Sequence, residues 1–246
     1  MNWTKTLDGG RARMISLCLV ACALAASPAL AGGELTPHTA EYKIKISVVG
    51  GRLSTELKST DSGYIARHYV EPTGLSKIVA HGDITEVSEF GAGDDGIYPI
   101  SYQTNDTIAK DDPRADIQFD WNTLEASGTV NDEEFHRDLD RLRQDRVSIQ
   151  YALMHDLLND QLRTQYELFE ADKLKTLNVR SIGTREIKVP AGTFTAVGIQ
   201  HQAENSSRVT TLWCAKEIDY LPVVIEQHRK GKLRVQAKLR RYTPGD

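Results

Sequence analysis

The sequence is poor in the residues and motifs from which most catalytic and metal sites are built. Only three of its 246 residues are cysteine, and aromatic residues make up 7%. It contains no C-x-x-C, H-E-x-x-H or G-x-S-x-G motif, and no two of its seven histidines stand two or four positions apart. These absences argue against a local zinc site, a dithiol redox centre and a serine nucleophile on a sharp turn. We therefore expect no metal, no cofactor and no catalytic residue set.

The sequence also lacks a strong excess of charge and, after its first 31 residues, any long apolar run. Its formal net charge is −4, whereas surfaces that bind nucleic acid are normally basic. No later stretch is apolar enough to cross a membrane as a helix. With 40% hydrophobic and 26% charged residues, the composition is typical of a globular protein. Nucleic acid is therefore not an expected partner.

The first 31 residues have the three parts of a secretory signal peptide. Three basic side chains come first, and residues 14–26 form an apolar run that is too short to span a bilayer. Ala29-Leu30-Ala31 then matches the A-x-A cleavage pattern. We expect cleavage after Ala31 and export to the periplasm, which leaves residues 32–246 as the mature chain.

A second cleavage pattern is present in the same segment. Leu19-Val20-Ala21-Cys22 fits the small-residue-then-cysteine signal of bacterial lipoproteins, which would leave the chain anchored to a membrane through a lipid on Cys22. The apolar run continues past Cys22 to the A-x-A site, so we favour the soluble form. Cleavage there leaves only Cys214, and an internal disulfide is then excluded.

Most of the remaining chain alternates apolar and polar residues with the period of β-strands. In residues 40–48, Ala40 and Tyr42 alternate with charged side chains, and Gly50-Gly51 is expected to form a two-residue hairpin turn. Comparable segments recur about every ten residues between short turns, which is typical of an all-β barrel or sandwich. No linker interrupts them, so a single domain over residues 32–246 is predicted.

Two polar segments are expected to contain no regular structure. Residues 91–96 match the dinucleotide-binding pattern G-x-G-x-x-G by letter, but an extended segment follows where phosphate binding requires a helix N-terminus. We predict a polar hairpin loop there and a solvated loop at residues 131–140. The acidic pairs Asp94-Asp95 and Asp111-Asp112 are predicted to be solvated turns and not calcium ligands.

One segment has the periodicity of a helix. Asp145 is suited to cap its start, and Val147, Tyr151, Met154 and Leu158 recur at the spacing of one helix face. A single amphipathic helix among strands usually covers the apolar face of the sheet. The predicted fold is therefore mainly β: an antiparallel, strongly curved sheet or incomplete β-barrel with one amphipathic helix packed on it.

The C-terminal part has the clearest strand pattern. Pro190 and Gly192 indicate a turn, residues 209–213 alternate with period two, and Pro222 stands where a proline can open a strand. Lys230-Gly231-Lys232 then forms a turn into a last alternating segment. Four consecutive antiparallel strands are predicted.

Several motifs carry a resemblance to a known family. They are V-P-A-G-T-F at 189–194, T-T-L-W-x-A-x-x-x-D-Y-L-P-V at 210–223, E-x-x-x-K-G-K at 226–232, and the segments 96–102 and 145–153. Over residues 34–242 the chain resembles the bacterial periplasmic proteins grouped as domain of unknown function 3108. The resemblance implies fold and compartment but no activity. Cys214 departs from it, because a larger apolar residue such as Phe is expected there.

The aromatic residues of these motifs are the candidates for a binding site. Trp213, Tyr220 and Phe194 are predicted to be core and corner residues of the sheet. Alternatively, they line an apolar cavity inside the curved sheet, together with Tyr151 and Met154 of the helix.

Three functions are open, and we favour the first. It is an exported, non-catalytic protein that binds an apolar ligand such as lipid or lipoprotein acyl chains. The second is a structural or assembly partner in the cell envelope with a filled core. The third is a hydrolase that uses Cys214 with His201 or His228 as its base. A large cavity favours the first, a filled core the second, and a Cys214–histidine contact in a cleft the third.

Overall fold

In this computed structural model the described residues are 33–245, apart from 47–48, 79, 111–112 and 171–172. The predicted signal peptide, its cleavage site after Ala31, the alternative anchor Cys22 and the acidic pair Asp111-Asp112 lie outside them. Gly32–Asp246 form one compact unit. No helix among the described residues combines the length and the apolar character needed to cross a membrane.

The described residues form one antiparallel sheet of 14 strands. In chain order the strands are β1 (His38–Ile46), β2 (Val49–Thr60), β3 (Gly63–Pro72), β4 (Ile84–Gly93), β5 (Gly96–Asp106), β6 (Arg114–Asp120), β7 (Glu125–Val130), β8 (Glu133–Asp138), β9 (Gln165–Glu170), β10 (Lys173–Val189), β11 (Gly192–Ala203), β12 (Arg208–Ala215), β13 (Leu221–Arg229) and β14 (Lys232–Pro244). Two short 3₁₀ helices, η1 (Gly74–Ile78) and η2 (Lys216–Ile218), connect strands, and α1 (Ser148–Leu158) stands between β8 and β9.

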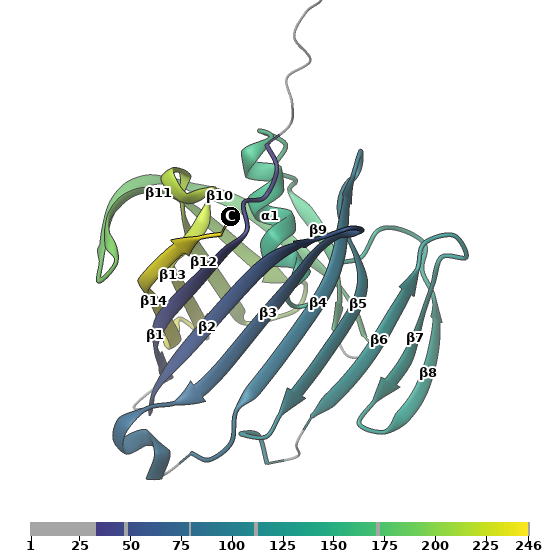
Figure 1. Ribbon diagram of the computed structural model, residues 1–246, viewed down its shortest axis with the longest axis horizontal. Coiled ribbons are helices and arrows are strands. Elements are labelled where there is room, and N and C mark those ends of the chain that lie inside the picture. Colours follow the sequence, from purple (N-terminus) through teal and green to yellow (C-terminus); the bar gives the residue numbers. More distant parts are fainter. Residues whose placement is uncertain (1–32, 47–48, 79, 111–112, 171–172, 246) are drawn as a thin grey trace, which may run out of the picture. The chain divides into compact units, whose positions relative to one another are not determined.

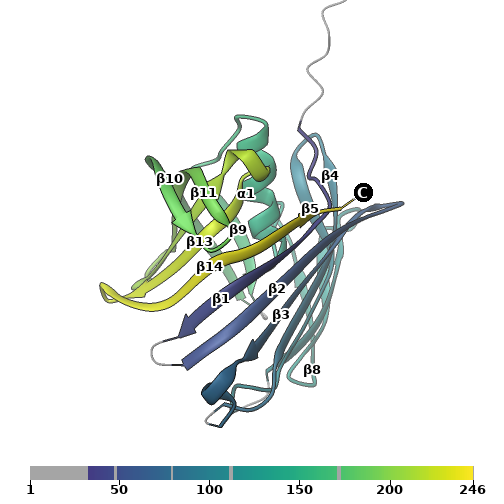
Figure 2. The same cartoon turned by 60° about the vertical axis from the view of Figure 1, so that its left-hand side comes forward.

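The sheet consists of two meanders that meet at its centre. Strands β1 to β8 follow one another toward one edge, and β9 to β14 return from the other edge until β14 pairs with β1. The edge strands β8 and β9 are not paired with each other, so the sheet is not closed. Figures 1 and 2 show it curling around α1. The predicted antiparallel, strongly curved sheet is therefore confirmed, as are the four consecutive C-terminal strands.

The strands follow the alternation of the sequence. In β6, Ala115, Ile117 and Phe119 are buried and the residues between them are exposed. This period-two pattern places one row of side chains on the concave face, where the core forms.

The helix α1 lies inside the curl, against β4 and β5 (Figure 1). The ring of Tyr151 stacks on that of Phe90 of β4, with 5.2 Å between centroids. Burial is not restricted to the predicted face, because Ile149, Ala152 and Leu153 are buried as well. A helix that is surrounded on several sides needs apolar residues around most of its circumference.

The residue Gln144 connects the edge strand β9 to β5. Its backbone N–H donates to the carbonyl oxygen of Glu167 at 2.8 Å, and its own carbonyl accepts from Phe169 N–H at 2.7 Å. Its side-chain Nε2 donates to the carbonyl oxygen of Ile97 at 2.6 Å. Two backbone groups of the β9 edge, the carbonyl of Glu167 and the N–H of Phe169, are thus paired with the segment that leads into α1.

Two predictions about loops are wrong. Gly50 and Gly51 do not form a hairpin turn but lie in β2, opposite Lys45 and Ile44. Glycine suits this place because a Cβ on Gly51 would lie 2.9 Å from the carbonyl oxygen of Glu71 on the neighbouring strand. Residues 131–140 are not a loop, since they contain β8. The charged composition reflects an exposed edge strand, where charges discourage pairing with other chains.

The predicted hairpin within residues 91–96 is confirmed. Gly93 pairs with Gly96, and Asp94-Asp95 form the exposed turn between β4 and β5. The loop seen in the sequence is therefore shorter than expected, because the first glycines belong to β4.

The start of α1 is capped by Asp145. The strict N-cap position is Val147, which makes no side-chain cap hydrogen bond, but Asp145 Oδ1 accepts from the N–H groups of Val147 at 2.7 Å and Ser148 at 2.8 Å. Asp145 Oδ2 accepts from Ser88 Oγ on β4 at 2.6 Å. Although these bonds favour the charged form, the dominant effect of burial raises the pKa of Asp145 to about 6. One carboxyl group thus fixes both the helix start and its position on the sheet.

Replacing this carboxyl group should destabilise the protein. Asp145→Ala leaves two helix N–H groups and the Ser88 hydroxyl without an acceptor in a buried place. We expect the free energy of unfolding to fall by about 2–4 kcal/mol. Urea denaturation followed by circular dichroism measures the change. Asp94→Ala, in an exposed turn, is the matched control and should change the value by less than about 0.5 kcal/mol; equal effects would contradict the role of Asp145.

Candidate functional site

A cleft of 610 Å³ lies between α1 and the concave face of the sheet. Its apolar lining comes from one helix and six strands, namely from Leu53, Ile149, Leu153, Leu168, Leu177, Ala203, Leu212 and Ile225. Binding sites for small molecules are commonly concave and of this size, and the other thirteen lining residues of this one are polar or charged. We refer to this space as the cleft.

The lining of the cleft changes from apolar to basic along β12 and β13. Three successive cross-strand pairs show this change: Leu212 is opposite Ile225, Thr210 is opposite Gln227, and Arg208 is opposite Arg229. The six residues line the cleft, because every second residue of a strand shares a face. From Leu212 to Arg208 the distance along the strand is roughly 13 Å. One end of the cleft is therefore apolar and the other carries positive charge.

Two further basic residues stand at the charged end of the cleft. Arg146, just before α1, has its Nε 3.2 Å from Glu86 Oε1, and Lys175 of β10 pairs with Glu170. Burial, together with the positive charges of Arg208 and Arg146, lowers the pKa of Lys175.

Two histidines line the polar part of the cleft. Burial lowers the pKa of His201 to about 4, and the pKa of His68 is also lowered to about 4, chiefly by burial. Both rings are therefore neutral at pH 7. Near neutral pH the positive charge of the cleft belongs to the arginine and lysine side chains alone.

Some buried polar groups near the cleft have no partner among the described residues. They include Thr55 Oγ1, His68 Nε2 and Tyr151 OH. Thr55 is directly opposite His68 on the neighbouring strand, and the rings of His68 and Tyr151 are 6.1 Å apart. These groups offer hydrogen bonds to a polar atom that enters next to His68.

The five residues suggested by the sequence lie outside the lining of the cleft. Tyr151 and Met154 are buried in the core beneath α1, next to Gln150 and Leu153, which do line the cleft. Since Leu212 faces the cleft, Trp213 points to the opposite face of the sheet, where the guanidinium of Arg185 stacks on its ring at 3.7 Å. A ligand-binding role for these residues is still a prediction.

Phe194 and Tyr220 lie apart from the helix residues Tyr151 and Met154 and from Trp213. Phe194 is half-buried in β11 opposite Ile187, and half-buried Tyr220 follows η2 with a positive φ of 58°. Each packs against the hydrophobic core. The structure therefore brings together only the two helix residues of the predicted set.

Cys214 has no histidine base among the described residues. It is 1% exposed, and burial raises the pKa of its thiol far above the usual value. His201 and His228 are opposite Thr210 and Val209, which lie four and five residues from Cys214 along β12. That offset corresponds to roughly 13 Å or more. A nucleophilic thiolate requires a nearby base or positive charge, which this site does not provide.

A second group of polar residues was not visible in the sequence. Glu125, His136 and Asp138 hold ligand atoms that all lie within 4.8 Å of one another on β7 and β8. The sequence did not indicate this group because Glu125 joins the other two only through strand pairing. His136 and Asp138 are exposed on the edge strand, and exposed acidic groups of this kind are common without an ion.

Of the two solved structures reported next, the first supports the fold and nothing beyond it. A crystal structure of a β-barrel-like protein of domain of unknown function DUF1849 from Brucella abortus has a TM-score of 0.58 and 12% identity, covering 87% of this chain and 100% of that one. A putative exported protein with a YmcC-like fold from Bacteroides fragilis NCTC 9343 has a TM-score of 0.33 and 10% identity, with coverages of 85% and 97%. No curated protein matches the chain in sequence.

The family comparison covers most of the chain. The sequence model described as "Protein of unknown function (DUF3108)" matches residues 39–236. This range contains both the cleft and the motifs that carried the resemblance. The chain therefore belongs to the DUF3108 family of proteins of unknown function.

Proposed function

We propose that this protein is a non-catalytic carrier of the bacterial cell envelope that holds the apolar chain of a lipid in the cleft. The observation that carries the proposal is the cleft itself, 610 Å³ in volume, in which eight apolar side chains from α1 and the surrounding strands line one end. A solidly packed interior would instead have favoured a structural or assembly partner, which is the alternative.

The energetics of chain burial are consistent with binding. Each buried CH₂ group contributes about 0.8 kcal/mol, so about ten methylenes contribute roughly 8 kcal/mol before the costs of association. The wall of the cleft is a continuous hydrogen-bonded sheet, which limits the conformational entropy lost on binding.

Export is part of the same proposal. Its support is the signal pattern of residues 1–31 and the cleavage site after Ala31. We expect the protein purified from the periplasm of its own cells to begin at Gly32, as determined by N-terminal sequencing and intact mass. A chain that begins at a lipid-modified Cys22 would establish the membrane-anchored alternative, and an uncleaved cytoplasmic chain would contradict export.

The carrier proposal is tested first by native mass spectrometry. The protein is purified from its own cell envelope under mild conditions, and anything bound is extracted with organic solvent and identified. We expect a stoichiometric lipid adduct. A clean mass of the protein alone, repeated after incubation with total envelope lipids, would contradict the carrier and favour the assembly partner.

A matched pair of substitutions locates the ligand. Ala203 lines the cleft, and the adjacent Gln202 is exposed and points away from it. Ala203→Trp fills part of the cleft, so we expect at least about ten-fold less bound lipid. Gln202→Trp should retain the level of the unmodified protein. The amount of extracted lipid per protein decides the question, and equal retention in both variants would place the ligand elsewhere.

The neutral histidine His201 generates a prediction about pH. Its pKa is about 4 in the folded protein and about 6.5 in an unfolded chain, so the unfolded state binds the proton more readily between these values. The stability associated with neutral His201 is present above pH 6.5 and is lost as the pH falls toward 4. Asp145 acts in the opposite direction, because its raised pKa removes stability as the pH rises from about 4 to 6.

The variant His201→Gln separates the two contributions. Between pH 7 and pH 4.5 the unmodified protein should lose about 2 kcal/mol more unfolding free energy than His201→Gln. Urea denaturation at both pH values measures this difference, in which the contribution of Asp145 cancels. Identical pH dependences would show that His201 is not held neutral by burial.

A further inference from the structure

Two arginines face each other across adjacent strands at the basic end of the cleft. Arg208 begins β12, and its direct partner in the register is Arg229, the last residue of β13. Neither side chain forms an ion pair with another described residue. Like charges directly opposite on neighbouring strands destabilise a sheet. An anion between the two guanidinium groups removes that repulsion.

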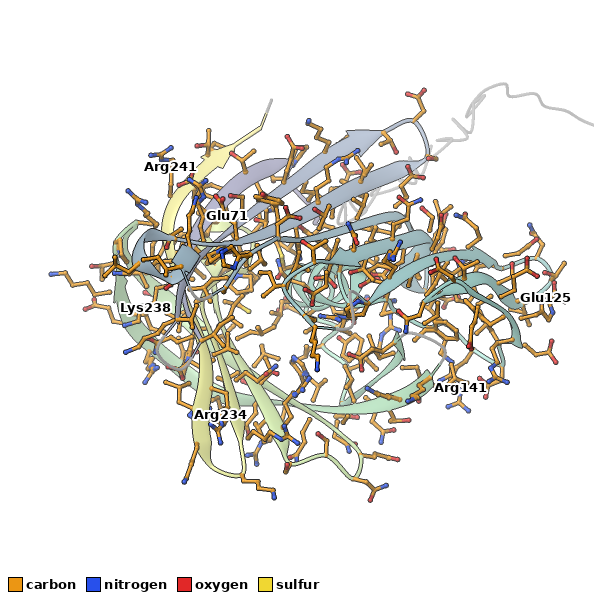
Figure 3. All side chains as sticks on the ribbon, turned by 90° about the horizontal axis from the view of Figure 1, so that it is seen from below. Glu71, Glu125, Arg141, Arg234, Lys238 and Arg241 are labelled. Carbon is orange, nitrogen blue, oxygen red and sulfur yellow. The ribbon has the colours of Figure 1, made fainter. Side chains whose placement is uncertain are left out.

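The surroundings of this pair are also basic. Arg208, Gln227 and Arg229 line, together with Lys230 and Arg234, a recess of 490 Å³ that adjoins the cleft. The recess has no acidic lining residue. Arg234 belongs to the irregularity where β14 has one residue more than β13, and such bulges re-aim a side chain. Figure 3 shows Arg234 beside the β13–β14 hairpin.

The positive charge is local and not a property of the whole chain. Residues 1–31 carry a net charge of +2, from Lys5, Arg11 and Arg13 against Asp8, so residues 32–246 carry −6. The lining of the cleft nevertheless contains four arginine or lysine side chains and a single carboxylate. In an acidic protein this concentration of positive charge at the end of an apolar cleft marks the place where a negative group would be stabilised.

A pair of like charges on neighbouring strands does not by itself indicate a ligand site. Lys43 and Lys238 are also directly opposite each other, on β1 and β14, but both are exposed on the convex face and line no part of the cleft. Figure 3 shows Lys238 farther along β14 than Arg234. The distinguishing feature of Arg208 and Arg229 is that the same strand faces continue, four residues away, into the apolar lining at Leu212 and Ile225. This second pair supplies a matched control.

We propose that the ligand is an anionic amphiphile, whose carboxylate or phosphate is bound by Arg208 and Arg229 while its apolar chain occupies the cleft. This inference rests on the proposed function, since it presupposes that the cleft takes an apolar chain. The guanidinium group binds carboxylate and phosphate oxygens through two parallel hydrogen bonds, and two such groups satisfy one phosphate head. Lys230 and Arg234 add positive charge around it.

Three decyl compounds separate the contributions of head and chain. Protein purified from its own cells is freed of lipid on a hydrophobic resin and titrated calorimetrically with decanoate, decyl phosphate and uncharged decanol below their micelle concentrations. We expect the two anions to bind at least about ten-fold more tightly than decanol, because a hydrogen-bonded charge contributes that much. The preference should weaken at high salt, which screens exposed charges.

Substitutions then assign the head-group site. Arg208→Gln with Arg229→Gln should remove the preference for anions and leave the affinity for decanol unchanged. Lys43→Gln with Lys238→Gln removes the same charge from the convex face and should behave as the unmodified protein. Arg208→Lys with Arg229→Lys retains the charge and should retain part of the preference. Thermal unfolding of each variant confirms that the fold persists.

The outcomes distinguish this inference from the proposal on which it rests. Equal affinity for all three compounds would overturn the head-group site while chain binding stands. A preference for anions that survives Arg208→Gln with Arg229→Gln would place the head elsewhere and overturn the assignment. Inorganic phosphate that binds as tightly as decyl phosphate would show a site for free anions instead of an amphiphile. Binding of none of the decyl compounds would overturn both proposals.

Discussion

One short segment pairs with the edge strand β9 and leads directly into the helix that the sheet surrounds. The residue Gln144 hydrogen-bonds through its backbone to Glu167 and Phe169 on the edge strand β9 and through its side chain to Ile97 on β5. It stands just before α1, so the residues that cover the edge also introduce the helix into the curl. The sheet is not closed, and the cleft lies between α1 and strands that include β10 to β13.

The chemistry of that space follows from the geometry of β-strands. Each second residue of β12 and β13 faces the cleft, so three consecutive pairs supply an apolar, a neutral polar and a basic level. An anionic amphiphile has a matching arrangement, with an apolar chain at one end and a charged head at the other. Neutral His201 and His68 leave the charge of the cleft, near pH 7, to the arginine and lysine side chains at one end. The separation of apolar and charged ends is therefore built into the register of neighbouring strands.

The sequence predicts the local features of this fold better than its pairings. Alternation and turn residues were sufficient for most strands, and Asp145 with the apolar spacing at Tyr151 and Met154 located the helix. Gly50-Gly51 was misassigned because its need for glycine comes from the backbone of β3, which the sequence does not reveal. The charged segment around β8 appeared to be a loop because an exposed edge strand has little apolar alternation. The cleft could not be predicted, because the apolar spacing of α1 does not show that Gln150 and Leu153 border the cleft while Tyr151 and Met154 do not.

The pairing of β1 with β14 has a consequence for the order of folding. The first and last strands of the described chain are neighbours at the centre of the sheet, with His38 opposite Pro244. Contacts between residues so distant in sequence form slowly, because a long loop must close first. A chain that emerges from its N-terminus can assemble β1 to β8 early but cannot join the two meanders until β14 is present. A chain that loses β14 therefore lacks the strand that connects the two halves of the sheet, and not merely an edge strand.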